Sequence, residues 1–239
     1  MLEAAIGAGT AAFGLVVGYI VADRYRPNDD LVGKIMGLGA GVLMAVVAYA
    51  LVLESVEGAE RPAIVGVGLA AGALVFDFGS RLLDRHFSTR RAANKEAAGG
   101  LSLALGAVLD GVPESMAIGI TAALSGEVGI PLVIAAFIAN IAEGLAASPE
   151  LEVNGMSRQA VLGIWIAILA ASVITALIGY GVMAAIATNA GALVNAFAAG
   201  AVLMVLSTSL IPEGYEKAGL VAGLMVVLGF AIGFSLEHL

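Results

Sequence analysis

Long apolar blocks alternate with short polar breaks along this chain of 239 residues. A membrane-spanning helix needs about 20 mostly apolar residues, and most of the blocks approach or exceed that length. The breaks carry turn-forming residues, as at Arg26-Pro27 and Thr188-Asn189. The pattern therefore predicts an all-α polytopic membrane protein with eight transmembrane helices. The predicted spans are Ala4–Ala22, Val32–Leu53, Ala63–Leu83, Gly99–Leu124, Ile130–Ala147, Ala160–Ala187, Gly191–Ile211 and Ala218–Phe234.

The basic residues predict the orientation of these spans. With eight spans, the segments at one side of the membrane hold every Lys and Arg except Arg61. Basic residues concentrate on the cytoplasmic side of membrane proteins, so that side is predicted to be the cytoplasm. Both termini are then expected outside, and the connection Asp84–Ala98 is expected to be a cytoplasmic loop. Seven or nine spans would break this sorting of charges.

Two apolar segments resemble each other although they should cross the membrane in opposite directions. In each, a Gly lies 13 residues before a Glu: Gly41 before Glu54, and Gly200 before Glu213. Such a pair is typical of an inverted-topology repeat, although chance similarity between apolar helices is the alternative. The repeat predicts a 3+2+3 arrangement, with segments 1–98, 99–150 and 151–239. The similar segments are Ala40–Glu57 and Ala199–Glu216.

Composition narrows the class of function. Hydrophobic residues make up 60% of the chain and charged residues 13%, against about 25% charged in soluble domains. No soluble domain is left over beside eight spans, so we expect a transporter rather than an enzyme. The net charge of −8 argues against nucleic-acid binding. The absence of Cys excludes disulfides and thiolate metal sites.

Two carboxylates interrupt the fourth predicted span near its middle. Asp110 and Glu114 are four residues apart, which places them on one face of a helix. Pro113 lies between them and should kink the helix and free a nearby carbonyl. Asn140 and Glu143 repeat the pattern in the fifth span. Ionisable groups at this depth are costly and mark a site or pathway, so we expect all four side chains to meet in one cavity.

The charge of this cavity points to a cation. No Lys or Arg occurs between Gly99 and Glu150, so protons or a bound cation must compensate the carboxylates. Carboxylate and amide oxygens suit divalent cations, while Ser115 and Met116 offer a hydroxyl and a thioether beside them. The alternative is a hydrogen-bonded polar group that only joins two helices.

Three further acidic residues are candidates for the pathway. Asp77 would be a supporting acid or a proton acceptor, or else a residue bonded locally to Arg81 one turn away. Glu54 and Glu213 would be carboxylates at the gates or mouths of the pathway, or else ordinary charges at the membrane surface. Trp165 is expected to pack within its span.

At the motif level the chain resembles the ZIP family of divalent metal transporters. The family's span-4 motif, His-Asn-x-Pro-Glu-Gly, corresponds to Asp110–Ser115, and its span-5 motif is similar to Ala139–Gly144. The resemblance implies eight spans in a 3+2+3 inverted arrangement, both termini outside, and metal ligands on spans 4 and 5. It implies Asp110, Glu114 and Glu143 as primary metal ligands, with Asn140 in a bridging or adjacent position.

The departures from that family affect the expected substrate. Asp110 and Ala139 stand where the family has histidines, and no His remains in the predicted spans. An all-oxygen site is less biased toward zinc, so zinc, iron, manganese, cobalt, cadmium and even magnesium stay open. Span 6 has no carboxylate to complete a second metal position.

The sequence therefore predicts a multi-pass plasma-membrane protein that moves divalent metal cations by alternating access. The metal ion is its substrate and no cofactor is expected. The expected partners are the metal ion, the lipid bilayer and, as a homodimer, a second copy of the chain. Two alternatives stay open: a proton-coupled transporter of another solute, and a family relative that lost transport and acts as a sensor or scaffold.

Overall fold

The structure is a computed structural model that describes residues 1–91, 98–186 and 190–238. Within these ranges the chain is almost entirely helical. The α-helices are α1 (Leu2–Tyr25), α2 (Asp29–Val46), α3 (Glu54–Gly58), α4 (Pro62–Arg91), α5 (Ala98–Ser125), α6 (Ile130–Val153), α7 (Arg158–Ala185), α8 (Gly191–Val205), α9 (Ile211–Ala218) and α10 (Leu220–Leu236). Two π-helical segments, η1 (Val47–Leu53) and η3 (Leu206–Leu210), join α2 to α3 and α8 to α9.

Six helices in the described ranges are long and apolar enough to cross a membrane. They are Leu2–Tyr25, Asp29–Gly58, Pro62–Leu82, Ile130–Val153, Arg158–Ala185 and Gly191–Ala218. Together with α5 and the shorter apolar α10, these six make eight rods. The structure thus supports the prediction of an all-α membrane protein.

The outer surface of the bundle is apolar, as a lipid-facing surface should be. Large side chains such as Leu74, Phe78, Leu224 and Val227 are exposed on α4 and α10. A soluble protein of this size would rarely expose so many large apolar groups side by side.

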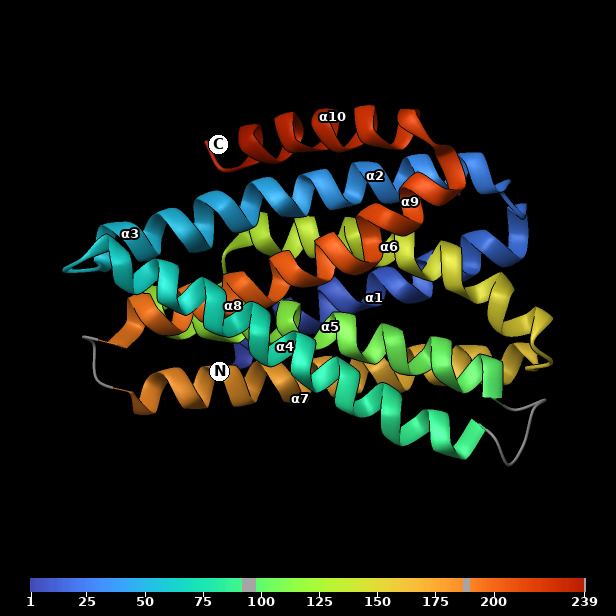
Figure 1. Cartoon of the computed structure of the whole chain (residues 1–239), viewed down its shortest axis with the longest axis horizontal. Coiled ribbons are helices and arrows are strands. Elements are labelled where there is room, and N and C mark those ends of the chain that lie inside the picture. Colours follow the sequence, from blue (N-terminus) through green and yellow to red (C-terminus); the bar gives the residue numbers. More distant parts are fainter. Residues whose placement is uncertain (92–97, 187–189, 239) are drawn as a thin grey trace.

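The rods lie side by side, with both chain termini toward the same end of the bundle (Figure 1). The turns between α1 and α2, between α6 and α7, and between α9 and α10 lie at the opposite end (Figure 1). Short connections between consecutive rods produce this alternation, because each rod must return along the bundle.

The predicted loop Asp84–Ala98 is longer than the connection in the structure, because residues 84–91 are helical. Helix α4 continues to Arg91, past the predicted span end at Leu83, and α5 begins at Ala98. The polar sequence after Leu83 ends the apolar block but not the helix, because its three Arg residues favour helix and backbone hydrogen bonding can continue into water. The remainder of this connection, residues 92–97, lies outside the described ranges, as does the predicted turn at Thr188-Asn189.

Helix packing divides the described rods into two groups. Helices α1, α5, α6 and α7 pack on one another, whereas α2, α4, α8 and α10 form the other group. Glycines allow the closest approaches inside each group: Gly14 of α1 lies against the α6 backbone at Phe137, and Gly41 of α2 lies against α10 at Val226. At both positions a Cβ would collide with the neighbouring backbone, so only glycine permits this spacing.

The two similar segments also match in structure. Their alignment pairs Val47 with Leu206, and these residues begin the two π-helical segments. The aligned glycines make equivalent contacts as well, since Gly41 of α2 meets Val226 of α10 and Gly200 of α8 meets Leu69 of α4. The second and seventh predicted spans therefore share a π-helical segment at the same aligned position. Each also packs closely, through an aligned glycine, against another helix.

The two groups meet through α2 against α6 and α5 against α8. Between them lies an apolar cluster of fully buried side chains that includes Val46, Ile118, Leu132 and Val202. The polar residues of the predicted site lie beside this cluster.

Candidate functional site

Glu114 and Asn140 meet between α5 and α6. Asn140 Nδ2 donates to Glu114 Oε2 over 3.2 Å and also to the Ala136 carbonyl over 2.8 Å. Both side chains are buried, Glu114 being 6% and Asn140 4% exposed. Helix α5 continues through Pro113, one residue before Glu114. Proline has no N–H, so the Leu109 carbonyl lacks its helical partner one turn earlier.

Asp110 contacts the opposite group of helices. Ser209 of η3 donates its hydroxyl to Asp110 Oδ1 over 3.3 Å, which joins α5 to the π-helical segment. Sequence reasoning missed Ser209, although the polar run Ser207-Thr208-Ser209 inside an apolar block was a usable signal. The structure thus pairs each of the two α5 carboxylates with a neutral hydrogen-bond donor from a different helix.

A cavity of about 410 Å³ lies next to this region. Two predicted ligands, Asp110 and Glu143, line it, but Glu114 and Asn140 do not, so the expectation that all four side chains share one cavity was wrong. The reason is that Asn140 holds Glu114 between α5 and α6. The remaining lining residues are Met36, Gly106, Ala146, Ala147, Glu150, Thr208, Ser209, Leu210, Pro212, Glu213 and Glu216.

The cavity continues toward one end of the bundle. A neighbouring cavity of about 550 Å³ shares Glu150, Glu213 and Glu216 with it and adds Asp29 and Lys217. These residues lie near the end of α6, in α9 and at the start of α2, at the end opposite the chain termini (Figure 1). Glu213 thus lies where the two cavities adjoin, near this end of the bundle.

Lys217 supplies a positive charge that sequence reasoning missed. Its Nζ lies 3.2 Å from Glu150 Oε1 and 3.5 Å from Glu213 Oε1, and its side chain is only 15% exposed. Lys217 lies outside the two central spans and is distant from Glu150 in sequence, so only the fold brings them together. It neutralises part of the cavity mouth.

Toward the other end, apolar packing closes the site. Beyond Glu114 and Asn140, the buried residues Ile118 and Leu132 pack with Val46 and Leu51 in the apolar cluster. The cavity that Asp110 and Glu143 line shares Glu150, Glu213 and Glu216 with the cavity at the end opposite the termini.

Asp77 forms an ion pair with Arg81. This local pairing was the predicted alternative to a role as a supporting acid or proton acceptor. Arg81 Nε lies 2.9 Å from Asp77 Oδ1, one turn away on α4. Asp77 also lines a cavity of about 270 Å³ that reaches Asp110 and Ser209 from the α4 side. It can therefore influence Asp110 through the cavity while remaining paired with Arg81.

Glu54 lies near the opposite end of the bundle from Glu213. It follows η1 and lies beside Asn195 of α8, whose amide donates to the Leu51 carbonyl over 3.2 Å. The two similar segments therefore place equivalent Glu residues at opposite ends.

The remaining predicted residues have packing positions. Ser115 is buried on α5, and Met116 packs against Gly179 of α7, so its thioether is held at the α5–α7 contact. Trp165 is fully buried and donates to Ser148 Oγ over 3.1 Å, which confirms its packing role.

Across the residues that the structure describes, no three Asp, Glu or His side chains converge closely enough to bind one metal ion together. The predicted ligands are instead distributed over two hydrogen-bonded pairs and a cavity wall. A cation bound here would combine carboxylates with neutral oxygens, or draw the carboxylates together.

Comparison of the chain with models of known protein families and with curated proteins finds no match.

Proposed function

We propose that this protein is a multi-pass membrane transporter of divalent metal cations that works by alternating access. The observation that carries the proposal is the position of Asp110 and Glu143. Both carboxylates lie deep in the bundle, line a cavity that leads to one end, and lie beside apolar packing that closes the other end.

Electrostatics favours a positively charged substrate. Each ionised carboxylate removed from water costs several kcal/mol unless a charge compensates it. Lys217 compensates Glu150 and Glu213 at the mouth, but the described ion pairs give no such partner to Asp110 or Glu143. A divalent cation at the inner wall would balance these two carboxylates.

The donor chemistry favours metals that accept oxygen ligands. Asp110, Glu143, Ser209 and Thr208 offer only oxygen atoms to the cavity. Zinc, iron, manganese, cobalt and cadmium are therefore all proposed substrates. The motif resemblance to the ZIP family also supports a divalent metal substrate, and it implies metal ligands on the helices that carry Asp110 and Glu143.

The proposed architecture is a 3+2+3 inverted repeat in the plasma membrane, with both termini outside. The paired π-helical segments and the equivalent contacts of Gly41 and Gly200 support the repeat. The concentration of basic residues supports the orientation. In this orientation the mouth that contains Glu213 and Lys217 faces the cytoplasm.

Alternating access would use the two groups of helices. One group contributes Asp110 and Glu143, and the other contributes Ser209 and Glu213. Glycine contacts hold each group together internally, whereas the boundary between them contains the cavity. A shift of one group along the other would break the Asp110–Ser209 contact and open the closed end.

Metal flux into proteoliposomes tests the proposal. We expect Asp110→Asn and Glu143→Gln each to reduce Mn²⁺ or Zn²⁺ flux at least tenfold, because each removes a charge that balances the cation. Glu60→Gln is the matched control, since Glu60 is exposed in the turn before α4. Parental flux in both site variants would overturn the assignment.

One observation favours a second candidate, a proton-coupled transporter of another solute. Among the described residues, no three acidic or His side chains converge to bind a metal ion. Asp110 and Glu114 each accept a hydrogen bond from a neutral donor, which is compatible with carboxyl groups that take up and release protons in a relay. Flux that follows the pH gradient and ignores every divalent metal would select this candidate.

A further inference from the structure

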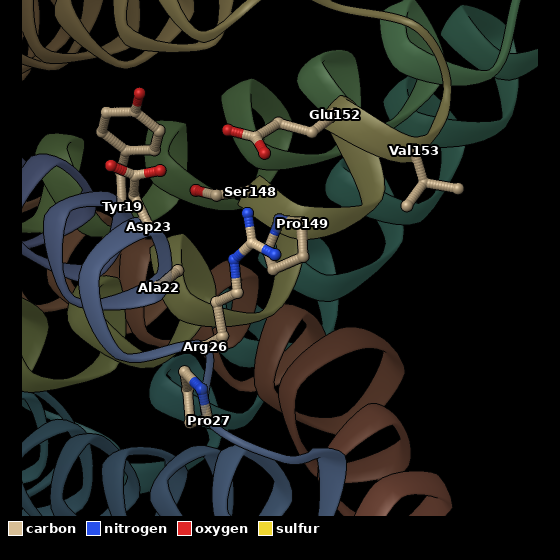
Figure 2. A pocket seen from close by; sticks show the side chains of 9 residues that line it. All are labelled: Tyr19, Ala22, Asp23, Arg26, Pro27, Ser148, Pro149, Glu152 and Val153. Atoms are coloured by element: carbon tan, nitrogen blue, oxygen red, sulfur yellow. The ribbon is translucent and has the colours of Figure 1, made fainter.

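A second polar pocket lies between the end of α1 and the last turns of α6, apart from the acidic cavity (Figure 2). Its volume is about 350 Å³. It combines charged and hydroxyl side chains with apolar ones, which is the usual character of a site for a small ligand group. The lining residues are Tyr19, Ala22, Asp23, Arg26, Pro27, Ser148, Pro149, Glu152 and Val153.

Arg26 has an unusual backbone for a residue of its kind. It caps the C-terminus of α1 with φ 45° and ψ 59°, and its N–H donates to the Ala22 carbonyl. Glycine or asparagine usually occupies this left-handed position. Here the conformation directs a guanidinium over the pocket toward Ser148 and Pro149 (Figure 2). A residue kept in a disfavoured conformation at a pocket is a reason to look for a ligand.

The charged groups of the pocket are incompletely paired. Within the described residues, neither Arg26 nor Glu152 belongs to an ion pair. Asp23 Oδ1 lies 2.8 Å from Arg158 Nη2, yet this buried oxygen accepts no well-directed hydrogen bond. Arg158 Nη1 also donates to Asp23 Oδ2 over 3.4 Å, so Asp23 is already paired with a cation. The pocket thus offers the guanidinium of Arg26 and the unpaired carboxylate of Glu152 to a ligand.

We propose that this pocket binds a phosphoethanolamine group, with the ammonium at Glu152 and the phosphate at Arg26. A simple anion would face the Glu152 carboxylate, and a simple cation would face the Arg26 guanidinium. A zwitterion satisfies both, and a guanidinium binds phosphate well because its N–H groups form a planar fork.

A primary ammonium fits better than a quaternary one. It carries N–H donors that can bond to the Glu152 carboxylate, whereas a choline group has none to donate. The pocket lies where two long apolar helices end, and the large side chains of its lining residue Val153 and of nearby Tyr25 are strongly exposed. This position suits the headgroup of a membrane phospholipid, and free phosphoethanolamine would share its chemistry.

The test measures lipid binding by the full chain in detergent, using native mass spectrometry and thermal unfolding. We expect phosphatidylethanolamine to bind and stabilise the protein more than phosphatidylcholine or phosphatidylglycerol does. Arg26→Ala and Glu152→Gln should each weaken this binding about tenfold, as expected for loss of a charged hydrogen bond. Arg24→Ala is the matched control, because Arg24 lies on the same helix end but outside the pocket.

Unfolding in phosphatidylcholine shows whether each variant folds as the parent does. A further arm adds free phosphoethanolamine in water; stabilisation equal to that of the lipid would identify the soluble group as the ligand. Equal binding of the three lipids with no effect of free phosphoethanolamine, or equal binding by Arg24→Ala, Arg26→Ala and Glu152→Gln, would overturn the proposal.

Discussion

Asn140 of α6 donates a hydrogen bond to Glu114 of α5 over 3.2 Å, deep in the bundle. The contact joins the two central helices and keeps Glu114 out of the cavity that Asp110 and Glu143 line. It also gives a buried carboxylate a neutral donor, which lowers the cost of burying it.

Loss of that donor should destabilise the protein. Replacing Asn140 by Leu leaves Glu114 buried without this hydrogen bond, which should cost about 1–3 kcal/mol of unfolding free energy. Denaturant unfolding in detergent measures the change. Asn154→Leu is the comparison, since Asn154 is exposed at the end of α6 and bonds only to its own helix. Equal effects of both substitutions would contradict a special role for the Glu114 contact.

Lys217 should control the mouth of the cavity. Lys217→Met removes the cation that pairs with Glu150 and Glu213, so a divalent metal should bind there several-fold more tightly while turnover falls. Calorimetry with Mn²⁺ and flux measurements check the two effects. Lys34→Met is a suitable control because Lys34 pairs with Asp30 on the surface, away from the cavity lining. Unchanged Mn²⁺ affinity in Lys217→Met would show that its charge does not limit cation binding.

The Ser209–Asp110 contact should matter for transport more than for stability. Ser209→Ala removes a neutral donor to a carboxylate at the boundary of the two helix groups, so we expect at least a several-fold change in flux. The stability change should stay near 1 kcal/mol, the net value of a typical hydrogen bond. Ser207→Ala serves as control, because the Ser207 hydroxyl bonds only to the Met204 carbonyl of its own helix. Parental flux in Ser209→Ala would argue against a moving boundary at this contact.

Glycine contacts give a prediction about stability that is independent of transport. A Cβ at Gly41 or Gly200 would meet the backbone of α10 or α4, so Gly→Ala at either position should destabilise by about 1–3 kcal/mol. Gly66 and Gly223 have open space around the missing Cβ. There the same substitution should be neutral or stabilising by up to about 1 kcal/mol, through helix propensity. Indistinguishable unfolding of the four variants would contradict the packing described for the two groups.

Pattern alone was sufficient for the class of fold. A helix in a bilayer must satisfy its own backbone hydrogen bonds, so block length and apolarity predict spanning helices directly. The sequence also located Asp110, Glu114, Asn140 and Glu143, because polar groups are conspicuous inside apolar blocks. The predicted end of α4 at Leu83 was wrong because hydropathy shows only where the apolar block ends. The helix itself continues through polar sequence to Arg91.

Tertiary structure decided which of these groups meet. Periodicity places Asp110 and Glu114 on one face of a helix, but packing pairs Asp110 with Ser209 and Glu114 with Asn140. Lys217 reaches Glu150 across a long separation in sequence, which spacing within one helix cannot reveal. The sequence by itself determined the helices and the acidic character of the site, because both follow from local composition. The partners of each carboxylate and the end toward which the cavity leads depend on contacts between distant segments, and only the fold defines those.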